Sequence, residues 1–219
     1  TVELPSKGLV YPKDNPLSSG KVEMKYMTAK EEDILTNQNY IKDGTVLDKL
    51  LKALIVSNVN YDDLIVGDKN AVMVAARILG YGADYTFKYE NEETTVDLSE
   101  LQSTYLDESK LLEEGVNRFE FTLPHSEVLI TFKLLDNKDE KAIKSEVKGL
   151  KKINKQSNPE LSTRLKHIIL SVNGDDDKKV IREFVDKYML ARDSRAFREY
   201  IKGFQPDIDL KFDLAGSDG

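Results

Sequence analysis

The spacing of the apolar residues changes twice along this chain, and these changes limit the folds that it can adopt. Between about residues 28 and 80 apolar residues recur every three to four positions, which is typical of helices that bury one face. From Tyr85 to Leu134 they alternate with polar residues, which is typical of half-buried strands. From Asp136 onward the helical spacing returns. We therefore expect an α+β protein.

The expected strands lie in the first 135 residues. Lys21 to Met27 alternates strictly and predicts one strand, and residues 85–98 and 119–134 each predict a β-hairpin. About five strands are enough for one small sheet. Helices in the same half are expected to begin at the N-caps Thr28, Thr45 and Asp68, with Glu31 completing a capping box after Thr28.

The remainder of the chain predicts helices. These cover residues 136–153, a stretch from Pro159 to Val172, residues 180–189, and a short helix capped by Asp193 and Ser194. We place a boundary at about Leu135 to Asp139. It separates an α+β domain (1–135), which holds helices and two hairpins in a small sheet, from an all-helical subdomain (136–219). The subdomain ends in a tail or a short strand in which Ile208, Leu210 and Phe212 alternate.

An extended arm precedes the first helix. In the stretch ELPSKGLVYP, Pro5 favours extended backbone and Gly8 permits a sharp bend. The arm carries the apolar side chains of Leu4, Leu9 and Tyr11. It either covers the protein's own core or lies along a partner, and Leu4, Pro5, Leu9 and Tyr11 are the candidate contact residues.

Composition narrows the classes of partner. The 219 residues carry a formal net charge of -7, and the chain contains no cysteine. Disulfides, thiolate zinc sites and cysteine nucleophiles are therefore excluded. A net-acidic chain repels polyanions, so we expect neither nucleic acid nor a membrane surface as partner. We also expect no membrane helix and no signal peptide, and we expect a soluble, cytosol-compatible protein.

No residue pattern indicates catalysis. His125 lies at a predicted hairpin tip and His167 lies on a predicted helix, and neither belongs to a known nucleophile or metal motif. The acidic runs at residues 136–140 and 175–177 precede helices, where they favour capping over calcium. The lysines of KGLKKINK fit a solvated helix face. We predict no catalytic residue, no cofactor and no metal.

The segment ARDSRAFREYIKGF suggests a second contact surface. Arg192, Arg195 and Arg198 recur every three residues, so they share one side of a helix. They adjoin Tyr200, and arginine and tyrosine are favoured at protein interfaces. An ordinary amphipathic helix with its arginines paired to Asp193 and Glu199 is the alternative.

Taken in order, several segments resemble the baseplate hub assembly proteins of T-even-type contractile-tailed phages. They are LPSKGLVYP, MTAKEEDIL, DGTVLDKLL, LIVGDKNAVMVAARILGYG, VDLSEL, FTLP and ARDSRAFREYI. The resemblance covers most of the chain. It implies a non-enzymatic hub component or assembly chaperone, located in the tail baseplate or in the infected host's cytoplasm during assembly. It also implies hub proteins and the tape-measure protein as partners.

The chain departs from that family at one point. Many relatives carry cysteine pairs, suggestive of a zinc-ribbon-like element, after the YG segment and near the C-terminus. Those places here contain YENEET and FDLAGSDG. Two other functions stay open: a general interaction adaptor or regulator unrelated to phage tails, and a carboxylate-dependent hydrolase. An oligomeric state is open as well.

Overall fold

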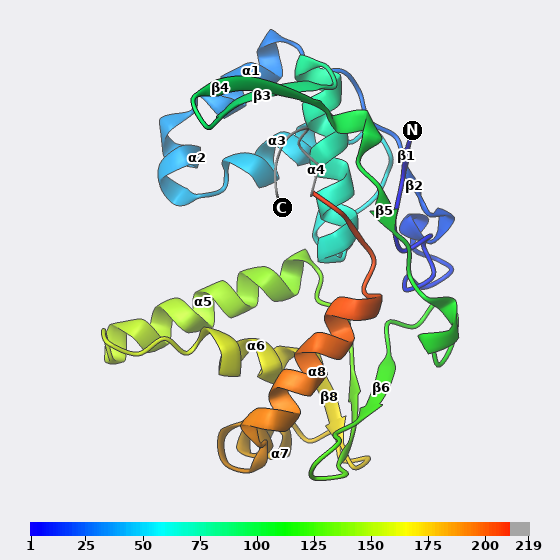
Figure 1. Cartoon of the computed structure of the whole chain (residues 1–219), viewed down its shortest axis with the longest axis vertical. Coiled ribbons are helices and arrows are strands. Elements are labelled where there is room, and N and C mark those ends of the chain that lie inside the picture. The colour runs from blue at the N-terminus through cyan, green and yellow to red at the C-terminus, as the bar shows by residue number, and fades with distance from the viewer. Residues whose placement is uncertain (211–219) are drawn as a thin grey trace.

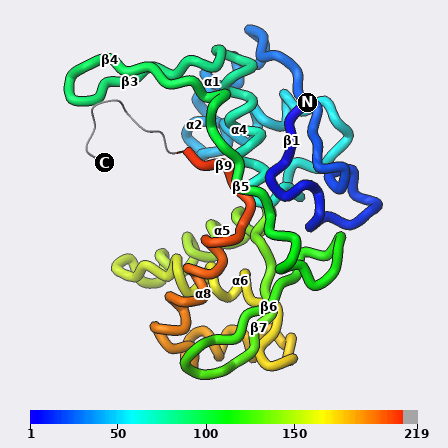
Figure 2. The backbone as a smooth tube through the Cα atoms, turned by 45° about the vertical axis from the view of Figure 1, so that its right-hand side comes forward, coloured from blue at the N-terminus to red at the C-terminus, as the bar shows by residue number. Residues whose placement is uncertain are grey.

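The computed structural model describes residues 1–210, which form two lobes, one above the other in Figure 1. The N-terminal lobe holds residues 1–115 and a short strand at residues 207–208. The C-terminal lobe holds residues 116–206. The backbone passes between the lobes just before β6 and again after α8, so the tube in Figure 2 returns to the lobe where it began.

The N-terminal lobe contains four α-helices. They are α1 (Ala29–Leu35), α2 (Gln38–Asp43), α3 (Val46–Leu54) and α4 (Val66–Tyr81). The predicted capping box at the start of α1 is present, because Thr28 and Glu31 bond to each other's backbone. Gly82 ends α4 with a φ of 84°, a backbone conformation that favours glycine.

The N-terminal arm folds back on itself before the helices begin. Strand β1 (Val2–Glu3) pairs antiparallel with β2 (Lys21–Val22), and the 3-10 helix η1 (Pro16–Ser19) lies between them. Gly8, with a φ of 78°, is packed so closely that an added Cβ would lie 2.4 Å from the carbonyl oxygen of Ser18. Only glycine fits this bend.

A hairpin and several short elements complete this lobe. Strand β3 (Asp84–Tyr89) pairs with β4 (Glu92–Asp97), as the alternation predicted. Strand β5 (Ser103–Thr104) pairs with β9 (Asp207–Ile208) from the other end of the chain. The 3-10 helices are η2 (Tyr61–Asp63), η3 (Leu98–Glu100) and η4 (Glu108–Lys110).

The C-terminal lobe combines a three-stranded sheet with four helices. Strand β7 (Leu129–Phe132) lies between β6 (Phe119–Thr122) and β8 (Ile169–Val172), all antiparallel. The helices are α5 (Asn137–Ile153), α6 (Glu160–Ile168), α7 (Lys178–Glu183) and α8 (Ala191–Phe204), and a π-helical turn (Phe184–Tyr188) follows α7. Asp136 caps α5 as predicted.

The predicted division into a sheet-bearing half and an all-helical half is wrong. Helices and strands are mixed in both lobes, and residues 1–210 contain four small antiparallel sheets, of two or three strands each, in place of one. The second hairpin belongs with the C-terminal helices, and β8 occupies part of the stretch that we expected to be helical. Ile169 and Val172 are β-branched residues that favour extended backbone, and the free edge of β7 supplies their hydrogen bonds.

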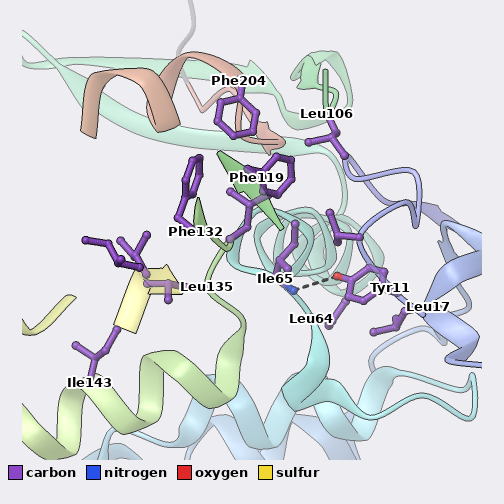
Figure 3. Close-up of a cluster of buried hydrophobic side chains, with 14 of the residues drawn as sticks. Tyr11, Leu17, Leu64, Ile65, Leu106, Phe119, Phe132, Leu135, Ile143 and Phe204 are labelled. Atoms are coloured by element: carbon purple, nitrogen blue, oxygen red, sulfur yellow. Dashed lines mark hydrogen bonds between the residues drawn. The ribbon is translucent and has the colours of Figure 1, made fainter. Parts of the chain in front are cut away.

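One hydrophobic core runs through both lobes. Tyr11, Leu17 and Leu64 of the N-terminal lobe belong to the same buried cluster as Phe119, Phe132 and Phe204, all labelled in Figure 3. The ring centroids of Phe119 and Phe204 are 5.1 Å apart. Backbone bonds reinforce this junction: Val66 N–H donates to the carbonyl of Leu135 and Asn137 N–H to that of Leu64, both at 3.0 Å. The boundary predicted near residue 135 therefore falls where the lobes are joined.

Candidate functional site

The predicted contact residues form two separate groups in the structure. Leu4, Pro5, Leu9 and Tyr11 lie in the arm of the N-terminal lobe, whereas Arg192, Arg195, Arg198 and Tyr200 lie on α8 of the C-terminal lobe.

A buried carboxylate holds the arm against α4. Asp68 accepts hydrogen bonds from the Ser6 backbone at 3.0 Å, the Ser6 hydroxyl at 2.6 Å and the Tyr11 hydroxyl at 2.6 Å. The Tyr11 oxygen also accepts the backbone N–H of Ile65 at 3.0 Å, the dashed line in Figure 3. Four hydrogen bonds thus satisfy these polar groups inside the core.

The arm directs its predicted contact residues inward. Leu4 is 1% exposed and Tyr11 is 5% exposed; Pro5 is buried, and Leu9 is half-buried against the core. Three of the four side chains therefore face away from solvent. This arrangement corresponds to the first of our two interpretations, in which the arm covers the protein's own core.

Asp68 is not the N-cap that its sequence position suggested. Helix α4 begins at Val66 with Ile65 as its N-cap, so Asp68 lies within the first turn and is fully buried. Burial raises its pKa, although the hydrogen bonds from Ser6 and Tyr11 act in the opposite direction. Residue patterns missed this site, since Ser6 and Asp68 are 62 positions apart.

Helix α8 buries an aromatic face. Phe197 is fully buried, and its ring lies edge-on to that of Phe132, with centroids 4.9 Å apart. Tyr200 is half-buried and stacks on Phe121 with centroids 4.5 Å apart. Tyr200 thus helps to pack α8 onto the sheet and exposes only part of its ring.

The arginines of α8 lie on its exposed side. Arg192, Arg195 and Arg198 are all exposed. Arg195 reaches Glu199 at 3.3 Å, and both side chains are more than 60% exposed, so the pair contributes little stability. Arg198 donates to the carbonyl of Ser194 at 3.3 Å. These three positions and Tyr200 are together called the α8 surface.

Asp193 has a structural function that differs from the predicted cap. Helix α8 begins at Ala191, and the fully buried carboxylate of Asp193 accepts the backbone N–H groups of His125 at 2.8 Å and Ser126 at 3.0 Å. Burial raises its pKa, but these bonds outweigh burial, and the net shift is downward. Asp193 thereby ties α8 to the turn between β6 and β7.

The two histidines lie on different elements of the C-terminal lobe. His125 contributes its backbone to that turn. His167 on α6 has its Nε2 atom 3.6 Å from a Glu146 oxygen, too far for a hydrogen bond. His167 also lines a cavity of about 340 Å³ between α5, α6, β8 and α7. Three cations lining it already pair with carboxylates, namely Lys133, Lys166 and Arg182.

Residues 1–210 contain no candidate metal centre and no candidate membrane-spanning helix. No group of three or more His, Cys, Asp or Glu side chains in that range is arranged to hold a metal ion. In the same range no helix combines the length and apolar character needed to cross a membrane. Comparison with protein-family models, curated proteins and solved structures finds no match for this chain.

Proposed function

We propose that this chain is a non-enzymatic component or assembly factor of a contractile-tail baseplate hub and acts through protein–protein contacts. The observation that carries the proposal is the α8 surface, where three arginines share the exposed side of a helix whose aromatic side is buried. An arginine row on a rigid, well-packed helix is a suitable contact surface, since arginine and tyrosine are favoured at interfaces.

The motifs that resemble the hub family give the proposal its direction. Two of them, LPSKGLVYP and the GDK segment, bond to each other through Ser6, Tyr11 and Asp68. The shared motif residues therefore include a core contact that fixes the arm. The proposed partners are hub proteins and the tape-measure protein, and the proposed location is the tail baseplate or the infected host's cytoplasm during assembly.

Binding to the hub proteins of the same phage tests the proposal. The chain is expected to co-purify with at least one of them, and Arg192→Glu with Arg195→Glu should weaken that binding at least about tenfold, because truncated or reversed interface charges are costly. Lys30→Glu with Lys42→Glu makes the same charge change at exposed positions of the N-terminal lobe and should leave binding intact. Lack of affinity for every hub and tape-measure protein would overturn the proposal.

A further inference from the structure

The chain presents two projecting surfaces of opposite charge. One is the hairpin of β3 and β4, residues 84–97, and the other is the free end of α5 with the loop after it, residues 147–159. We call them the acidic hairpin and the basic tip. Figures 1 and 2 show both extending from the body toward the same side of the molecule.

The basic tip is unusual in a chain whose net charge is -7. It contains four lysines and no acidic residue, and none of these lysines has an ion-pair partner among residues 1–210: Lys148, Lys151, Lys152 and Lys155. Ile153 within it is 87% exposed and Leu150 is 38% exposed. The tip thus combines unneutralised positive charge with aliphatic surface.

The acidic hairpin has the complementary composition. It carries five carboxylates against the single Lys88, and within the described part of the chain none of the five forms an ion pair: Asp84, Glu90, Glu92, Glu93 and Asp97. Tyr85 is 44% exposed and Tyr89 is 39% exposed. Tyrosine surface beside carboxylates suits a partner that offers lysine and aliphatic side chains.

Arg77 holds the hairpin in its projecting position. The guanidinium group donates to the carbonyls of Gly82 at 3.1 Å and Asp84 at 3.3 Å, and it stacks over the rings of Tyr81 and Tyr85 at 5.2 and 5.9 Å. The base of the hairpin is therefore fixed to α4. A fixed projection loses less conformational entropy on binding than a mobile one.

We propose that the basic tip of one copy of this chain binds the acidic hairpin of a second copy. Both surfaces face the same side of the molecule. A two-fold axis beside that side therefore places the basic tip of each copy against the acidic hairpin of the other copy. The result is a closed dimer with two identical contacts, the commonest symmetry of protein oligomers. The aliphatic centre of the tip favours a protein partner over nucleic acid, which offers no aliphatic surface of this kind. This inference does not depend on the proposed hub function.

Charge reversal with a cross-rescue tests the dimer. Sedimentation and light scattering should show a monomer–dimer equilibrium at low salt that weakens at 1 M salt, where the screening length falls to about 3 Å. Lys151→Glu with Lys152→Glu should lower the association constant at least about tenfold, and so should Glu92→Lys with Glu93→Lys. Mixing these two variants should restore a one-to-one heterodimer, because each contact is again between opposite charges.

Matched controls make the same charge changes elsewhere. Lys30→Glu with Lys42→Glu and Glu113→Lys with Glu114→Lys replace exposed residues and should leave the dimer intact. Far-ultraviolet circular dichroism verifies that each variant folds. A wild-type chain that stays monomeric at low salt overturns the proposal, as does a dimer that resists both reversals or a mixture that fails to associate. Loss of hub binding with an intact dimer would count against the proposed function alone.

Discussion

At the residue scale, Asp68 shows how a local pattern can give the wrong function for a side chain. An aspartate ahead of an apolar helical stretch is a good N-cap candidate, yet here it is buried and bonds to an arm 62 residues away. The pattern cannot reveal this bond because the two partners meet only after the lobe has folded. Thr28 and Glu31 were predicted correctly, since a capping box lies within four consecutive residues.

Tyr11→Phe tests the arm lock. The substitution removes the hydroxyl that donates to Asp68 and accepts from Ile65 N–H, so two buried polar groups lose a partner. We expect the free energy of unfolding to fall by about 1–3 kcal/mol, measured by urea denaturation. Tyr105→Phe, at a position 48% exposed, is the control and should change little. If Tyr11→Phe were as stable as Tyr105→Phe, the hydrogen bonds of the Tyr11 hydroxyl would contribute nothing to stability.

Asp136→Asn tests a pH dependence at the N-cap of α5. The pKa of Asp136 is raised to about 6, first by burial and then by the negative charge of the Asp139 side chain. The hydrogen bond from the Asp139 backbone N–H acts in the opposite direction but is outweighed. The unfolded-state pKa is about 3.9, so the folded state holds the Asp136 proton more tightly than the unfolded state does. The free energy of unfolding therefore falls as the pH rises from about 4 to 6. Asparagine caps equally well and carries no charge.

The variant should therefore exceed wild type in stability above pH 6, by about 1–2 kcal/mol after allowance for solvent screening, and converge with it near pH 4. Urea titrations at the two pH values measure the difference. Asp177→Asn, the same substitution at the exposed cap of α7, should behave like wild type at both. A pH-independent difference at Asp136 would contradict the assigned cause.

At the scale of elements, local hairpins and capped helices were predictable and long-range pairings were not. The hairpin of β6 and β7 and the helix α5 follow from alternation and from Asp136. Strand β8 joins β7 from about 40 residues away, and the β-branched Ile169 and Val172 do not by themselves distinguish it from one more helical turn. A short helix with the three arginines on one side was predicted, but α8 begins earlier, at Ala191, and the role of Asp193 depends on a turn 67 residues earlier.

Asp193→Ala should loosen the packing of α8 against the sheet. The turn between β6 and β7 would lose the acceptor of two backbone N–H groups, those of His125 and Ser126. We expect a loss of about 1–3 kcal/mol at pH 7. The pKa of Asp193 is lowered in the fold, so its contribution is fully present above the unfolded pKa and is lost as the pH falls through the lower pKa of the folded state.

Denaturant titrations at neutral and strongly acidic pH check this, and the difference from wild type should shrink in acid. Asp14→Ala, an exposed site, is the matched control. Hydrogen exchange of the amides of His125 and Ser126 should accelerate selectively in the variant. Unchanged exchange at both amides would disprove the capping function.

At the scale of the whole molecule, the two lobes unfold as one unit if the continuous core determines cooperativity. Polar contacts add to that core at the junction, where Asp62 accepts from Asn137 at 2.7 Å and pairs with Lys141 at 2.8 Å. The chain also returns to its first lobe, where β9 pairs with β5 and Pro206 lies against α4. No sequence pattern predicts such a return, because it depends on where both lobes end in space.

Gly67→Ala tests whether this return holds the molecule together. Gly67 lies in the first turn of α4, and a Cβ there would come within 1.8 Å of the carbonyl oxygen of Pro206, so either the helix or the strand must move. We expect a loss of about 1–3 kcal/mol in the free energy of unfolding, as for other overpacked sites, with faster hydrogen exchange at the Ile208 amide. The control is Gly149→Ala in α5, where nothing lies within 4 Å of an added Cβ; it should stabilise the chain by about 0.5–1 kcal/mol. If both substitutions raise stability, the C-terminal strand does not pack on α4 closely enough to join the lobes.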